Sequence, residues 1–134
     1  AYATLGYGLP AAIGAAIADP SRPAVAIVGD GALMFSVQEL MTAVEQGIDL
    51  TVVCVDNGGY REIRENEADL GIALIGVDLH QPDWALLARA FGGNGHRVDD
   101  RSAVADTIAR AIAEPGVSLV HIPFSVYTVA EEAP

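Results

Sequence analysis

Two apolar runs, separated by one amphipathic segment, constrain the fold of this chain more than any other feature. Residues 24–28 and 50–55 consist almost entirely of apolar and β-branched side chains, which is typical of strands that are covered on both faces. The segment 36–46 between them carries apolar residues at helical spacing. A strand, a helix and a second strand in this order predict a parallel βαβ unit with a right-handed crossover.

The rest of the chain repeats this alternation. We expect further helices at 10–18, 83–91 and 100–112, and further strands at 95–98 and 117–122. Hydrophobic residues make up 51% of the chain and aromatic residues only 6%, so its core must be mainly aliphatic. Residues 1–134 are therefore predicted to form one α/β domain, a three-layer open and mostly parallel sheet with helices on both faces.

Some local features are less uniquely determined. Ser36 and Glu39 match a capping box at the start of the second helix, and Asp83 is a candidate cap before the 83–91 helix. The helix near residue 100 can begin at Asp100 or at Ser102. Charged residues 61–69 suggest a helix, and the 71–79 segment fits a short strand or an extended loop. The tail 125–134 is expected to be a loose end or a link to another part of a longer protein.

The charge and cysteine content exclude several classes of function. A formal net charge of −11 argues against nucleic acid or an anionic membrane surface as a partner. Cys54 is the only cysteine, so no disulfide forms within the chain, which fits the reducing cytoplasm. No apolar stretch approaches the roughly 20 residues of a membrane span. The chain begins at Ala1 directly on a motif, and we expect it to be a piece of a longer protein.

Polar residues on glycine-flanked turns follow both strands of the predicted βαβ unit. Asp30 lies in the turn 29–31, and Asn57 lies in the turn 56–59. Because parallel strands end at one edge of the sheet, both side chains should lie along that edge. A carboxylate, an amide oxygen and a backbone carbonyl suit Mg²⁺, which completes its octahedron with phosphate oxygens and water. The glycines would let the backbone approach a phosphate, and the helix beginning at Ser36 would add N–H donors.

Each of these turns has a simpler interpretation when it is taken alone. An Asp or Asn in a glycine-rich turn commonly bonds to its own backbone. The pair of turns on consecutive strand ends favours the metal and phosphate interpretation. It also accounts for anion binding by an acidic chain, because a cation would offset the surrounding negative charge.

The spacing of these motifs resembles a known family. Gly29-Asp30-Gly31 is followed by the 24 residues 32–55 and then by Asp56-Asn57. The chain thus resembles the diphosphate-binding domain of thiamine diphosphate (thiamine pyrophosphate) enzymes of the acetolactate synthase, pyruvate decarboxylase and benzoylformate decarboxylase group. Their pattern is Gly-Asp-Gly, about two dozen residues, and then Asn-Asn. Further matches occur at residues 6–14 and within 38–43.

This resemblance implies a set of site residues. Asp30 and Asn57 would bind Mg²⁺ through their side chains, and Gly59 would bind it through its backbone carbonyl. The cofactor-binding set comprises Gly29, Asp30, Gly31, Ala32, Asn57, Gly59 and Tyr60. The residue at position 56 departs from the family, which has Asn there, and the role of Asp56 stays open. Ile63 stands where pyruvate decarboxylase-like members carry an acid, which argues against simple decarboxylation of pyruvate.

The resemblance also implies an activity that this chain does not carry alone. We expect a thiamine diphosphate- and Mg²⁺-dependent decarboxylase or carboligase acting on a small 2-oxo acid. In this family the catalytic glutamate lies on the pyrimidine-binding domain of a partner subunit, in a homodimer or homotetramer. This chain would then bind the cofactor, supply no catalytic residue and be inactive by itself. Two alternatives stay open, namely a separate small subunit of a two-subunit decarboxylase and a non-catalytic oligomerisation module.

Overall fold

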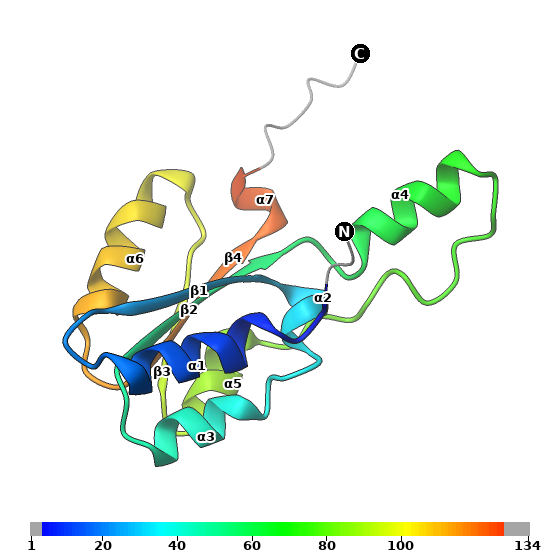
Figure 1. Cartoon of the computed structure of the whole chain (residues 1–134). Helices are drawn as coiled ribbons and strands as arrows, with labels where there is room; N and C mark the ends of the chain where they lie inside the picture. The colour runs from blue at the N-terminus through cyan, green and yellow to red at the C-terminus, as the bar shows by residue number, and fades with distance from the viewer. Residues whose placement is uncertain (1–3, 128–134) are drawn as a thin grey trace.

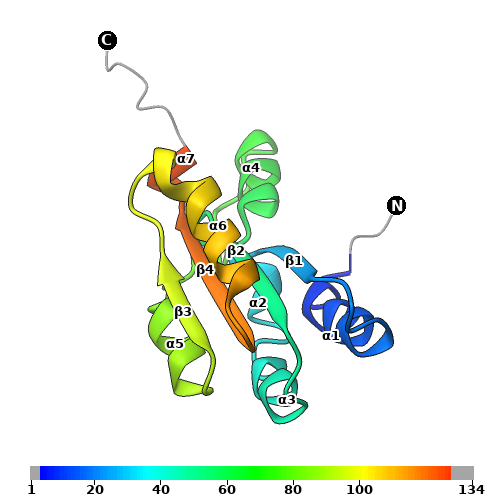
Figure 2. The same cartoon turned by 90° about the vertical axis from the view of Figure 1, so that its left-hand side faces the viewer.

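Four parallel strands form the centre of the molecule in the computed structural model, which describes residues 4–127. They lie in the order β1-β2-β4-β3, and Figure 2 shows β1 at one edge of the sheet and β3 at the other. The strands are β1 (Ala24–Gly29), β2 (Leu50–Asp56), β3 (Asn94–Arg97) and β4 (Val117–Pro123). The predicted parallel α/β fold is confirmed.

Helices cover both faces of this sheet, as the sequence predicts. The helices of the described residues are α1 (Gly8–Ala18), α2 (Asp30–Leu33), α3 (Glu39–Glu45), α4 (Arg61–Asp69), α5 (Trp84–Ala90), α6 (Val104–Ala113) and α7 (Phe124–Tyr127), with a 3₁₀ turn, η1 (Arg101–Ala103). Figure 1 shows α1, α3 and α5 below the sheet and α6 above it. Right-handed crossovers explain this division. The chain moves in one direction from β1 to β2 and on to β3, and then turns back to β4 through α6.

Two aliphatic cores hold the three layers together. The larger one packs α1, α3 and α5 against the sheet, with Leu40 and Trp84 fully buried against Val52 and Leu119. The smaller one lies beneath α6 and contains Val53 and Val120 among its buried side chains. Strands β2 and β4 are buried along nearly their whole length, which explains their continuous apolar runs.

The expectation that residues 24–28 are covered on both faces is wrong for one face of β1. Ala26 is buried in the larger core, whereas Val25 and Ile27 are 41% and 74% exposed. The reason is that α6, the helix on this second face, packs against β2, β3 and β4. The apolar run therefore reports strand formation correctly but overstates its coverage.

The predicted capping box at Ser36 is also wrong. Helix α3 begins at Glu39 and has no side-chain cap. The Ser36 hydroxyl is buried without a hydrogen-bond partner in the described part of the chain, and the Glu39 carboxylate accepts from Thr42 Oγ1 at 2.8 Å. The short helix α2 begins directly after β1, and a turn follows it. In this turn the backbone N–H of Glu39 donates to the Ser36 carbonyl oxygen at 2.9 Å, so the N–H that a capping box would use is already paired.

The remaining local predictions divide as follows. Residues 61–69 form α4, which has no buried residue and projects from the body in Figure 1. The loop after α4 forms one β-bridge, between Asp78 and Gly59.

Asp83 caps α5 by accepting from Leu86 N at 2.8 Å. Neither Asp100 nor Ser102 begins the α-helix near residue 100, because α6 starts at Val104 without a side-chain cap. Asp100 instead caps the 3₁₀ turn η1 before it, where its side chain accepts from the backbone N–H of Ser102.

The predicted loose tail divides at residue 127. Residues 124–127 form the short helix α7, and the rest of that tail lies outside the described residues. Within residues 4–127, no helix has both the length and the apolar character needed to span a bilayer.

Truncating the buried face of α3 should destabilise the protein. Leu40 is 1% exposed and Leu86, on the outer face of α5, is 57% exposed. Leu40→Ala should lower the free energy of unfolding by about 3 kcal/mol, because it leaves a cavity in the larger core. The matched control Leu86→Ala should change it by less than about 1 kcal/mol. Chemical denaturation measures both values, and equal losses would contradict this description of the core.

Candidate functional site

Asp30 and Asn57 meet at the carboxyl edge of the sheet. Strands β1 and β2 pair in parallel with Gly29 opposite Val55, so the residues that follow them leave the sheet side by side. Asp30 is the first residue of α2 and is 1% exposed. The Asn57 backbone N–H donates to Asp30 Oδ1 at 3.3 Å. The structure thus brings together the two side chains that the sequence singles out.

Three oxygen-bearing groups converge at this point. The Asn57 side-chain amide faces Asp30 Oδ1 and the carbonyl oxygen of Gly59. With its nitrogen on that side, the amide donates to them at 3.1 and 3.2 Å. With its oxygen on that side, three oxygens face one another without a proton between them, an arrangement that a cation would stabilise. One carboxylate, one amide and one carbonyl are a donor set that fits Mg²⁺.

The second oxygen of Asp30 supports this fit. Asp30 Oδ2 is buried and has no hydrogen-bond partner among the described residues. Burial raises the pKa of Asp30, hydrogen bonds from backbone N–H groups, chiefly that of Asn57, oppose the rise, and the negative charge of Asp56 adds to it. An ionised, incompletely paired carboxylate is costly inside a protein, and a bound cation would remove that cost.

Two glycines of the turns are required by contacts within the chain. A Cβ on Gly31 would lie 2.9 Å from the Tyr60 ring, and one on Gly59 would collide with the Val77 carbonyl oxygen. Gly59 also has φ 135°, a backbone conformation that side-chain-bearing residues rarely adopt. These glycines let the Asn57 turn pack closely against α2 and the 77–79 loop.

A hollow of about 480 Å³ lies over these groups. Its lining includes every predicted cofactor-binding residue, namely Gly29, Asp30, Gly31, Ala32, Asn57, Gly59 and Tyr60, and it adds Leu5, Arg61, Glu62, Ile63 and Asn66. The sequence did not single out Leu5 and Asn66. The positions 62, 63 and 66 have helical spacing, which is the signal that identifies one face of α4 as a wall of the hollow.

Arg61 is the cation of this lining, and other parts of the chain hold it. Its Nε pairs with Glu65 Oε1 at 2.8 Å, and its guanidinium lies 4.2 Å from the centre of the Phe124 ring.

The oxygen cluster itself consists of a carboxylate, an amide and a carbonyl. Within residues 4–127 no cluster of three His, Cys, Asp or Glu side chains could hold a metal, so a metal here would depend on neutral oxygens as well.

Asp56, whose role the sequence left open, is turned toward strand β4. Its Oδ2 lies 2.8 Å from His121 Nε2, and its Oδ1 accepts from Gly58 N at 3.0 Å. The Tyr127 hydroxyl donates to the Asp56 backbone carbonyl at 2.9 Å. Burial, together with the charges of Asp56 and Asp30, raises the pKa of Tyr127 to about 12, which keeps this hydroxyl protonated.

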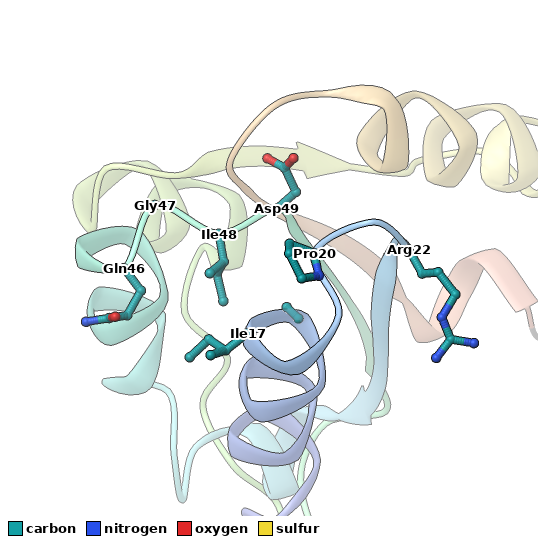
Figure 3. A pocket seen from close by; sticks show the side chains of 8 residues that line it. Ile17, Pro20, Arg22, Gln46, Gly47, Ile48 and Asp49 are labelled. Carbon is teal, nitrogen blue, oxygen red and sulfur yellow. The ribbon is translucent and has the colours of Figure 1, made fainter.

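A second hollow, of about 340 Å³, lies at the opposite end of the sheet. Figure 3 shows it between the Ile17 end of α1 and the loop that carries Gln46 and Asp49. Its charged groups are engaged within the chain. Arg22 pairs with Asp19 at 2.8 Å, and Asp49 accepts from Gly116 N at 2.6 Å. The carboxyl edge, with its unpaired Asp30 oxygen, is therefore the stronger candidate site.

This chain is similar to known proteins over most of its length. A family profile described as the C-terminal thiamine pyrophosphate (TPP)-binding domain of thiamine pyrophosphate enzymes matches residues 1–122. A probable 2-ketoarginine decarboxylase of Pseudomonas aeruginosa is 38% identical over 122 residues, which cover 90% of this chain and 22% of the relative. The acetolactate synthase large subunit of Parasynechococcus marenigrum is 34% identical over 122 residues, 89% of this chain and 20% of the relative.

A solved structure with a similar fold is the thiamine diphosphate-dependent 4-hydroxybenzoylformate decarboxylase of Rhodococcus jostii. It has a TM-score of 0.82 at 28% identity, over 89% of this chain and 23% of that one. This chain therefore spans about a fifth to a quarter of the length of the proteins it resembles.

The burial of Asp30 predicts a pH dependence of stability in the absence of divalent cations. Its pKa in the folded chain lies above the ordinary 3.8, so the folded state takes up a proton at a higher pH than the unfolded state. Stability should therefore increase as the pH falls through this raised pKa, and the gain should be complete below the ordinary value.

The Asp30→Asn variant tests the direction of this pH dependence of stability. It should be more stable than the parent at pH 7 without metal, and the difference should shrink as the pH falls, because protonated Asp30 is also neutral. Thermal denaturation in a chelating buffer measures the difference, with the exposed-residue variant Asp106→Asn as control. A difference that does not change with pH would contradict the assignment to Asp30.

Proposed function

Because this chain belongs to the thiamine pyrophosphate enzyme family, as a C-terminal thiamine pyrophosphate-binding domain, we propose that it anchors the cofactor's diphosphate through Mg²⁺ at the carboxyl edge of its sheet. The observation that carries this proposal is the convergence of Asp30 Oδ1, the Asn57 amide and the Gly59 carbonyl. The unpaired, buried Asp30 Oδ2 beside them supports it.

In this proposal each residue of the hollow has a defined task. The side chains of Asp30 and Asn57 and the backbone carbonyl of Gly59 bind Mg²⁺. The cofactor-binding residues that line the diphosphate are Gly29, Gly31, Ala32 and Tyr60. The N–H groups of α2 would face the diphosphate, since residues of α2 line the hollow and α3 starts only at Glu39. In a chain with net charge −11, the cation would make binding of this anion favourable.

We further propose that the whole protein decarboxylates a small 2-oxo acid. The remaining group then either takes up a proton or is joined to a second carbonyl compound. The relatives named above, two decarboxylases and an acetolactate synthase, support this class of reaction. When bound, thiamine diphosphate supplies the nucleophilic carbon and the electron sink. The residues of this chain bind the cofactor, orient it and help to exclude water.

The same proposal includes the place of this domain in the whole protein and its partner subunit. The 1–134 segment acts as one domain of a longer, cytoplasmic enzyme, is inactive by itself, and receives the catalytic glutamate from the pyrimidine-binding domain of a partner subunit in a homodimer or homotetramer. Exposed apolar side chains near the hollow, Leu5, Phe35 and Ile63, are 43%, 56% and 48% exposed. Such a surface suits a second domain that closes over the cofactor.

Calorimetry on the intact protein tests the metal assignment. Asp30→Ala and Asn57→Ala should each weaken thiamine diphosphate binding in the presence of Mg²⁺ by about tenfold or more, since each removes a metal ligand. Matched controls are Asp106→Ala, on the exposed face of α6, and Asn94→Ala, whose amide bonds to Pro115 and Ser118. Both controls should bind like the parent.

Unchanged affinity in the Asp30 and Asn57 variants would refute the assignment. If the parent itself bound neither Mg²⁺ nor diphosphate, the chain would instead be a non-catalytic module that keeps the fold.

A further inference from the structure

A chain of hydrogen bonds crosses three strands and ends beside the oxygen cluster. Arg97 on β3 lies opposite His121 on β4, and its Nη1 is 3.3 Å from His121 Nδ1. His121 Nε2 is in turn 2.8 Å from Asp56 Oδ2 on β2. His121 is 2% exposed and Asp56 is 8% exposed, so water competes little for the bond between them, whereas the Arg97 side chain is half exposed.

The direction of each bond in this chain can be deduced. A guanidinium can only donate, so Nδ1 of His121 must accept from Arg97. The proton of the neutral ring then lies on Nε2, and His121 donates to Asp56 Oδ2. The other carboxylate oxygen accepts from Gly58 N at 3.0 Å, and the backbone carbonyl of Asp56 accepts from Tyr127. All three oxygens of Asp56 therefore have a partner.

These bonds hold the turn that carries two of the three oxygen ligands. Asp56 lies directly before Asn57. The Asp56 side chain accepts a hydrogen bond from the N–H of Gly58, which lies directly after Asn57. Gly58 and Gly59 have φ 87° and 135°, and two successive glycines have more backbone freedom than any other pair of residues. Partners outside the turn are needed to fix its conformation. The 77–79 loop holds the later part of the turn, because Leu79 N donates to the Gly58 carbonyl at 2.8 Å, and the chain from Arg97 through His121 holds its beginning at Asp56.

We propose that Arg97, His121 and Asp56 form a positioning chain that orients the Asn57–Gly59 turn for Mg²⁺. This inference rests on the proposed function and extends it to β3 and β4, whose residues do not touch the metal. It also accounts for the acid at position 56. A carboxylate can accept from His121 and from Gly58 on separate oxygens. An asparagine has one acceptor oxygen, and its amide N–H would oppose the Nε2 proton that Arg97 enforces.

Reversing the direction of the hydrogen bonds tests this proposal. Asp56→Asn should weaken Mg²⁺ binding about 10- to 100-fold, the usual effect of losing a group that orients a metal ligand. Adding Arg97→Gln should restore most of that affinity. Without the guanidinium, which can only donate, Nδ1 can carry the proton and donate it to the glutamine oxygen or to solvent at this half-exposed position. Nε2 can then accept from the new amide at position 56, whose oxygen still receives Gly58 N–H. A merely structural loss would not be reversed by a second change at the surface of β3.

The affinity is measured by titrating Mg²⁺ into the intact protein with excess thiamine diphosphate, and thermal denaturation in chelator reports folding. His121→Phe should weaken Mg²⁺ binding similarly, whereas His121→Gln, which keeps a donor for Asp56, should retain most of it. These two variants decide the question if Asp56→Asn does not fold. The matched control is His96→Gln, since His96 lies on β3 of the same sheet and its Nε2 pairs with Glu114, the residue after α6, at 2.7 Å.

The outcomes separate this proposal from the proposed function. Normal Mg²⁺ affinity in Asp56→Asn or His121→Phe, or failure of Arg97→Gln to restore it, would overturn the positioning role while Asp30→Asn still loses the metal. Normal affinity in Asp30→Asn would remove the metal site itself, and the positioning role with it.

Discussion

The parallel pairing of β1 with β2 is the constraint on which the rest of the site depends. It places Gly29 opposite Val55, so Asp30 and Asn57 leave the sheet at one edge and come within hydrogen-bond distance. The apolar side chains that stabilise this pairing are distant from the chemistry. Burial of the strands thus positions polar groups that contribute little to the core.

Stability and binding are opposed at Asp30. A carboxylate that is 1% exposed, has one unpaired oxygen and lies near Asp56 is unfavourable for the fold alone. A cation would turn the same arrangement into a favourable one. Local violations of good packing are expected where function requires them, and this is the clearest such violation among the described residues.

The success of sequence-based prediction here depends on the range of the interactions. The βαβ unit and the shared edge of Asp30 and Asn57 follow from periodicity and from strand order along the chain. The Ser36 capping box failed because a short helix directly after β1 changed the local backbone bonding. The coverage of Ile27 was overstated because an apolar run does not say which neighbours a strand has. The role of Asp56 was undecidable because its partner, His121, is on a strand far along the chain.

The sequence by itself therefore determined the α/β class, the glycine-flanked turns and the shared edge of Asp30 and Asn57, since these are set by local pattern and spacing. The wider set of cofactor-binding residues came from the family resemblance. Only the tertiary structure decided that β4 lies between β2 and β3, and hence that His121 lies between Asp56 and Arg97. It also decided how deeply Asp30 is buried. Both depend on contacts between residues distant in the sequence, whose free energies are settled together when the layers pack and cannot be read from any one segment.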